Sequence, residues 1–141
     1  MSLGLFLSSC SSPCGSNKDE LISNYNAFIK KTQEAKLSVN AAEWNEPDKK
    51  FRQFVKECYP KHEAKMSVVE KGEFWYNAAG YVYARYGKSA FTDLAGSNEI
   101  VDLIKSKMGE MGKDLDDVFN DIKSAWGGLE KMFNGLKELI N

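Results

Sequence analysis

The chain has 141 residues and a formal net charge of −1, with 19 Lys and Arg against 20 Asp and Glu. Nucleic-acid-binding domains carry a clustered basic excess, so this balance argues against nucleic acid as a partner. Apolar residues make up 43% of the chain, which is typical of a globular protein. The length favours one domain, and no apolar stretch approaches the roughly 20 residues of a membrane span.

The first ten residues resemble the end of a bacterial lipoprotein signal. An almost wholly apolar run, residues 3–7, precedes Ser8, Ser9 and Cys10. In such signals the small residues admit a peptidase, and the cysteine thiol takes the lipid. Cys10 is therefore the expected lipidation site, with residues 1–17 as signal remnant and polar tether. The apolar run is shorter than the usual stretch of about 7–15 residues and no Lys or Arg precedes it, so a tail that merely contains a cysteine is the alternative.

The cysteine count agrees with an anchor in an oxidising compartment. The chain has three cysteines, and an odd cysteine in a secreted protein needs an explanation. Lipidation of Cys10 would leave Cys14 and Cys58 as a disulfide pair, with two unpaired thiols as the alternative. The anchored protein would belong to the cell envelope, attached to the outer membrane and facing either the periplasm or the exterior.

Apolar residues at helical spacing indicate two helices in the first part of the chain. The first is expected over residues 18–38, with Asn17 and Glu20 at the spacing of a capping box. The second begins near Asn45. Pro60 should end or kink it, because the proline ring clashes with the carbonyl four residues back.

A third helix and a long fourth one follow. Ser67 and Glu70 form a capping box, and the third helix should run to about Tyr86 and stop at Gly87. Residues 89–97 are predicted to be a connector.

Residues 98–140 show the strongest periodicity, a heptad seam typical of a long amphipathic helix. Gly109 and Gly112 could break this helix near its start, so its continuity stays open. The positions of the seam are Ile104, Met108, Met111, Leu115, Val118, Ile122, Ala125, Leu129, Met132, Leu136 and Leu139. The pattern predicts an all-α fold: a helical bundle of three helices plus a long amphipathic C-terminal helix. Residues 18–141 would form a single helical domain, with a three-helix part at 18–87.

Several short motifs carry a resemblance to a known family. They are Phe28-Ile29-Lys30-Lys31, Trp44, Asp48, Phe51, Tyr59, Met66-Ser67, Glu70-Lys71 and the stretch from Tyr81-Val82 to Tyr86. With these motifs, residues 21–86 resemble an uncharacterised family of small helical Bacteroides lipoproteins, a domain of unknown function. The resemblance implies an envelope location and a helical bundle, and it supplies no activity. Pro60 departs from the family pattern, where uninterrupted helix is expected.

One pair of residues has the chemistry of a site. Cys58 and His62 are four residues apart and would share a helix face, as a metal pair or a thiolate–imidazole pair require. Pro60 lies between them, and His62 is the only histidine. We therefore expect no catalytic, metal or cofactor site, and we do not expect an enzyme.

Aromatic and apolar side chains suggest interaction surfaces instead. The third helix carries more rings than one inward stripe can hold, so some must reach solvent or a second neighbour. Exposed rings would suit a protein or glycan partner, whereas burial on two sides is the alternative. The long helix could fold back on the bundle, or drive homo-oligomer formation or membrane association. The candidate interaction residues are Trp75, Tyr76, Tyr83, Tyr86, Trp126, Leu129 and Phe133.

The leading functional hypothesis is a non-enzymatic, lipid-anchored envelope protein that binds a partner or has a structural role. A glycan-binding module that uses the third helix is one alternative. A self-associating or membrane-associating protein that uses the C-terminal helix is the other.

Overall fold

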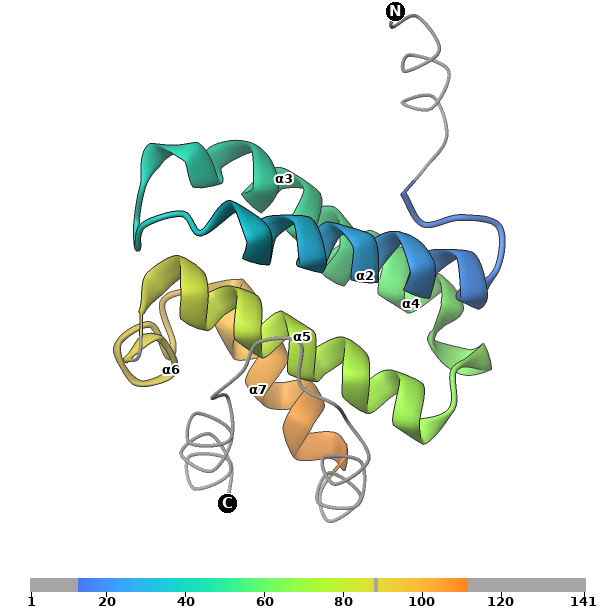
Figure 1. Ribbon diagram of the computed structural model, residues 1–141. Coiled ribbons are helices and arrows are strands. Elements are labelled where there is room, and N and C mark those ends of the chain that lie inside the picture. Colours follow the sequence, from blue (N-terminus) through green and yellow to red (C-terminus); the bar gives the residue numbers. More distant parts are fainter. Residues whose placement is uncertain (1–12, 88, 112–141) are drawn as a thin grey trace, which may run out of the picture.

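The structure is a computed structural model that describes residues 13–87 and 89–111 (Figure 1). Every regular element in these two ranges is helical, which confirms the all-α class. The α-helices are α2 (Lys18–Ala35), α3 (Asn45–Gln53), α4 (Tyr59–His62), α5 (Val68–Tyr86), α6 (Ala90–Asp93) and α7 (Glu99–Met111). Three further turns of other helical types are η1 (Ala42–Trp44), η2 (Phe54–Cys58) and η3 (Glu63–Lys65).

Helix α5 lies at the centre of the described fold, where it packs on α2 and on α7, and the α3–η2–α4 segment lies beside α2 (Figure 1). The side toward α2 is aromatic: Tyr25 stacks on Phe74 with ring centroids 4.0 Å apart. The Tyr25 hydroxyl donates a hydrogen bond to the Phe74 carbonyl at 3.0 Å, so this buried polar group is satisfied. Helix α5 is therefore buried on two sides.

Helix α2 begins as predicted and ends earlier than predicted. The Asn17 side chain accepts the Glu20 N–H at 2.9 Å, which confirms the cap. The return bond of a capping box is missing, because the Glu20 carboxylate accepts the Ser16 N–H instead. The helix ends at Ala35 rather than Ser38, since Lys36 adopts a left-handed conformation with φ 49°.

Pro60 was expected to end or kink the helix, and it does not end it. Helix α3 continues through the π-helical turn η2 into α4, which contains Pro60. At the end of η2 the Tyr59 N–H bonds to the Phe54 carbonyl, five residues back instead of four. A π turn widens the helix and shifts its bonding pattern just where proline supplies no N–H and crowds the preceding turn. The helix therefore accommodates the ring without ending.

Both predicted ends of α5 are confirmed. The Ser67 hydroxyl accepts the Glu70 N–H at 3.1 Å, and the Glu70 carboxylate accepts the Ser67 N–H at 2.8 Å. At the other end, Gly87 has φ 101° and its N–H bonds to the Tyr83 carbonyl at 2.8 Å. The segment 89–97 is more than a connector: it contains α6, whose Phe91 is buried.

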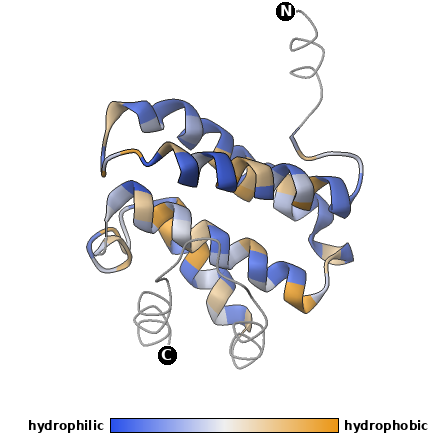
Figure 2. Ribbon diagram, in the orientation of Figure 1, coloured by the Kyte–Doolittle hydropathy of each residue, from blue (hydrophilic) through white to orange (hydrophobic). Residues whose placement is uncertain are grey.

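Helix α7 contributes the first described part of the heptad seam. Ile104 and Met108 are fully buried, so these seam positions pack within the chain. Gly109 lies inside α7 and does not break it. Residues 112–141, with Gly112 and the rest of the seam, lie outside the described residues. Hydrophilic residues cover much of α2 and α3 (Figure 2), as expected for helices that expose one side to solvent.

Candidate functional site

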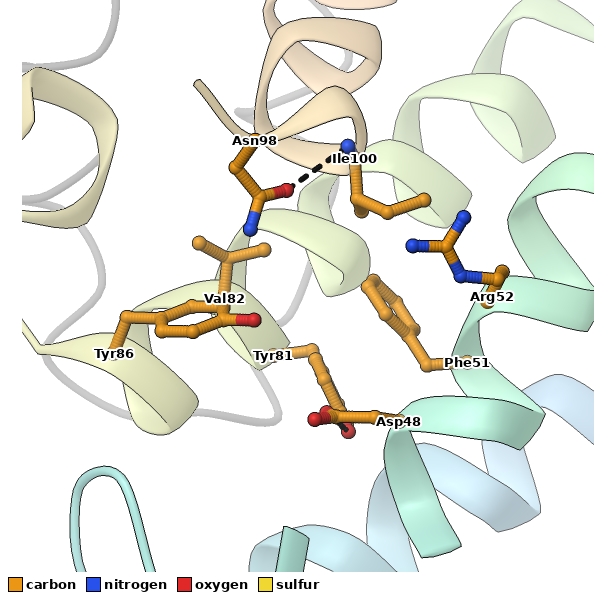
Figure 3. A pocket seen from close by; sticks show the side chains of 8 residues that line it. All are labelled: Asp48, Phe51, Arg52, Tyr81, Val82, Tyr86, Asn98 and Ile100. Carbon is orange, nitrogen blue, oxygen red and sulfur yellow. Dashed lines mark hydrogen bonds between the residues drawn. The ribbon is translucent and has the colours of Figure 1, made fainter. Parts of the chain in front are cut away.

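A small cavity of about 100 Å³ lies between α3, α5 and the start of α7 (Figure 3). Figure 3 shows polar side chains from all three elements around it. The cavity is lined by Asp48, Phe51, Arg52, Tyr81, Val82, Tyr86, Asn98 and Ile100. Its volume suits a few waters at most, so its polar groups decide what the site can do.

Asp48 is the centre of a hydrogen-bonded cluster beside this cavity. Its Oδ1 accepts the Tyr81 hydroxyl at 2.5 Å, and its Oδ2 accepts Arg85 Nε at 2.9 Å. Tyr81 and Arg85 are four residues apart on α5, so they share a helix face, while Asp48 lies in the first turn of α3. Stacking of Phe51 on Tyr81, with centroids 3.9 Å apart, closes the apolar side. We call Asp48, Tyr81 and Arg85 the α3–α5 latch.

Arg85 extends the latch to the loop before η1. Its Nη1 donates to Asn40 Oδ1 at 3.1 Å, and its carbonyl accepts the Asn40 N–H at 2.9 Å. The guanidinium also lies 4.6 Å from the Tyr86 ring centroid and 5.8 Å from that of Trp44. Hydrogen bonds to the side chain and to the backbone N–H of Asn40 hold the loop against the end of α5. The Trp44 and Tyr86 rings add cation–π attraction to the guanidinium.

The latch leaves little reactive capacity at the cavity. Burial, and then the hydrogen bond to Asp48, raise the pKa of Tyr81 far above its usual value, so its hydroxyl stays protonated. Both Asp48 oxygens already accept bonds from the protein. The carboxylate is therefore poorly placed as a general base and the phenol as a nucleophile, and the cluster acts chiefly to join α3 to α5.

We expect Tyr81→Phe to lower the free energy of unfolding by about 1.5–3 kcal/mol, the range for a hydrogen bond to a charged group. The matched control is Tyr83→Phe, a half-buried tyrosine of the same helix whose hydroxyl makes no hydrogen bond among the described residues. It should change stability by less than about 0.5 kcal/mol. Urea denaturation followed by circular dichroism measures both, and equal losses would contradict the latch.

Glu99 joins the start of α7 to α3 on the surface. It accepts bonds from Arg52 and from Lys56, the latter at 3.0 Å. These bonds, with Arg52 the stronger influence, lower the pKa of Glu99. All three side chains are largely exposed, so the cluster orients α7 and adds little stability.

A second cavity of about 180 Å³ lies between α4, α5 and α7. Lys107 of α7 pairs there with Glu63 at 3.2 Å. The cavity is lined by Tyr59, Glu63, Val68, Lys71, Trp75, Lys107, Glu110 and Met111. Two lysines and two glutamates balance each other, so the lining selects no ligand charge.

Cys14 and Cys58 form a disulfide, with their Cα atoms 4.6 Å apart. This is the pairing that the cysteine count left open. Because the Cys58 sulfur is bonded to Cys14, it cannot act as a thiolate beside His62. No group of three or more His, Cys, Asp or Glu residues that could hold a metal ion occurs in the described ranges.

A family model with the description "Domain of unknown function (DUF6565)" matches residues 29–138. The chain belongs to this family. The match extends through the C-terminal third, beyond the resemblance over residues 21–86. No curated protein and no solved structure matches the chain. Within residues 13–87 and 89–111, no helix of this DUF6565 protein is long and apolar enough to cross a membrane.

Of the two alternatives for the rings of the third helix, an open interaction surface is wrong for Trp75 and Tyr76, and burial on two sides is the one that α5 adopts. Trp75 and Tyr76 are each 1% exposed, because α5 has packed neighbours on two sides, so these rings cannot form an open binding surface. Tyr83 and Tyr86 are half-buried. Cys10, Trp126, Leu129 and Phe133 lie outside the described residues.

The latch residues were not among the sequence candidates. Tyr81 and Arg85 do stand four apart on one helix face, a signal that was available in the sequence. Their partner Asp48 lies far away in the chain, and only the packing of α3 on α5 joins them.

Proposed function

We propose that this DUF6565 protein is a lipid-anchored protein of the bacterial cell envelope, attached to the outer membrane through Cys10. The disulfide between Cys14 and Cys58 is the observation that supports this proposal best. Disulfides form and persist in secreted and periplasmic proteins, and they are rare in the reducing cytosol. An envelope compartment is therefore the natural location for this fold.

The disulfide also distinguishes Cys10 from the other two cysteines. It uses two of the three cysteines, so Cys10 is the one that remains for lipidation. Cys10 follows Leu7-Ser8-Ser9, the apolar and small residues that precede a lipidated cysteine. The pairing and the motif thus support the same assignment of the three cysteines.

We further propose a non-enzymatic structural or interaction role. The Asp48 carboxylate beside the first cavity is engaged in bonds to the protein, and the second cavity has a balanced charge. Burial of Trp75 and Tyr76 weighs against glycan binding on α5. A protein partner is therefore favoured over a glycan. Self-association or membrane association through residues 98–140 is the alternative, although burial of Ile104 and Met108 favours packing within the chain.

Cys10→Ser in the full-length precursor should release the protein from the membrane fraction. Each buried methylene adds about 0.8 kcal/mol, and stable anchoring needs at least two acyl chains, all of which the variant loses. Cell fractionation and the intact mass of the purified protein measure the two effects. Cys14→Ser combined with Cys58→Ser is the control, since it removes the disulfide and should keep the acyl mass. Membrane retention of Cys10→Ser, with no acyl mass on the wild type, would disprove the anchor.

A further inference from the structure

The segment that leads from the proposed anchor into the fold is pinned to one side of the molecule. Cys14 is buried and bonded to Cys58, the last residue of η2. The Pro13 carbonyl accepts a hydrogen bond from Asn24 Nδ2 at 3.0 Å. Gly15 turns with φ 70°, and a Cβ there would lie 2.5 Å from the Cβ of Glu20. The chain thus lies tightly on α2 from Pro13 onward.

This pinning sets how far the domain can move from its lipid. Only three peptide units separate Pro13 from Cys10, and they can span at most about 11 Å. A lipidated Cys10 lies at the level of the headgroups, so the Pro13 attachment point must stay within that distance of the bilayer. The attachment point lies beside α2 and the end of η2, and α2 packs on α4 and on one side of α5, whereas α7 packs on α5 (Figure 1).

We infer that the α2–α4 side of the domain rests on phospholipid headgroups, an inference that depends on the proposed lipidation of Cys10. The exposed groups near the attachment point are polar. Lys31 is exposed two turns beyond Asn24 on the same face of α2, and Lys61 is exposed one turn beyond Cys58. Ammonium groups at these positions match the phosphates of a bilayer surface.

The polarity of this side indicates contact at the headgroups without insertion. Among the described residues, the exposed large hydrophobic side chains are Val39, Val68 and Val69, and none belongs to α2 or α4. Residues 18–65 carry ten Lys and Arg against eight Asp and Glu, whereas residues 66–111 carry five against six. This asymmetry is small. The short tether therefore sets the orientation, and charge contributes little to it.

Lysine labelling of the lipidated full-length protein tests this orientation. The protein is acylated with a small water-soluble ester in detergent and in vesicles of phosphatidylethanolamine and phosphatidylglycerol, and the modified peptides are quantified by mass spectrometry. We expect labelling of Lys31 and Lys61 to fall severalfold in vesicles, while that of Lys105 on α7 is unchanged. The acyl mass on Cys10 is measured in the same sample. If the acyl mass is absent, the anchor is wrong; if it is present and the three lysines respond equally, the orientation is wrong.

A variant with a longer tether gives a second test of the orientation and leaves the fold unaltered. Insertion of about ten Gly and Ser residues between Ser12 and Pro13 adds roughly 17 Å of mean reach. The protein should stay anchored and the disulfide intact, but Lys31 and Lys61 should regain most of their labelling. Undiminished protection in this variant would overturn the role of the short tether.

Discussion

Replacing both cysteines of the disulfide, Cys14→Ser with Cys58→Ser, should lower the free energy of unfolding by about 4 kcal/mol. The bond closes a loop with a sequence separation of 44 residues, and its loss lets the unfolded chain explore many more conformations. The total stability of a domain is only about 5–15 kcal/mol, so this loss is a large part of it. Urea denaturation followed by circular dichroism at neutral pH measures the change.

Two comparisons separate the effect of the disulfide on the free energy of unfolding from the effect of replacing cysteine side chains. Reduction of the wild-type protein should reproduce most of the effect, because it opens the same loop without changing a side chain. Cys10→Ser leaves the bond intact and should unfold like the wild type. The dependence of the unfolding free energy on urea should become steeper without the bond, since the unfolded chain exposes more surface. A loss under about 1 kcal/mol would show that the disulfide contributes little to the fold.

Trp44→Ala should cost about 3–5 kcal/mol, the range for removing a buried tryptophan side chain. Trp44 is 1% exposed, and its ring packs in a T-shaped arrangement with the Tyr81 ring, with centroids 5.2 Å apart. Its Nε1 donates to the Ser38 carbonyl at 2.8 Å. The substitution would leave a void beside the α3–α5 latch and remove the partner of a carbonyl in the loop, so two penalties add.

Neighbouring substitutions give the controls for Trp44. Val39→Ala, in the same loop but 53% exposed, should change stability by no more than about 0.5 kcal/mol. Trp44→Phe keeps most of the apolar volume and loses the N–H, so its cost should lie between the two. Equal urea midpoints for Trp44→Ala and Val39→Ala would mean that the Trp44 ring contributes no packing energy. The result would instead support a role for an exposed Trp44 ring in binding.

Two attachments limit how the domain could turn on a membrane if Cys10 carries the proposed anchor. The disulfide holds the start of the described chain, and the latch with Trp44 holds the loop between α2 and α3. A domain fixed at both places can keep one side toward the membrane.

Local signals in the sequence determined the fold class and several helix ends. The cap at Asn17, the capping box of Ser67 and Glu70, and the stop at Gly87 are all present. Each depends on groups within about four residues of one another, so local chain geometry is sufficient to specify it. Cys10 likewise was proposed from adjacent residues alone.

Tertiary packing decided the remaining features. Whether Trp75 and Tyr76 face solvent depends on whether α5 has neighbours on two sides. A periodic apolar pattern indicates only one buried face of a helix. Pro60 was expected to end or kink a helix, yet the helix continues through the π turn of η2, whose residues are largely packed in the core. The latch and the Cys14–Cys58 bond each join residues more than thirty positions apart. Their partners are set by how the helices pack, because only packing brings groups so distant in the chain within bonding distance.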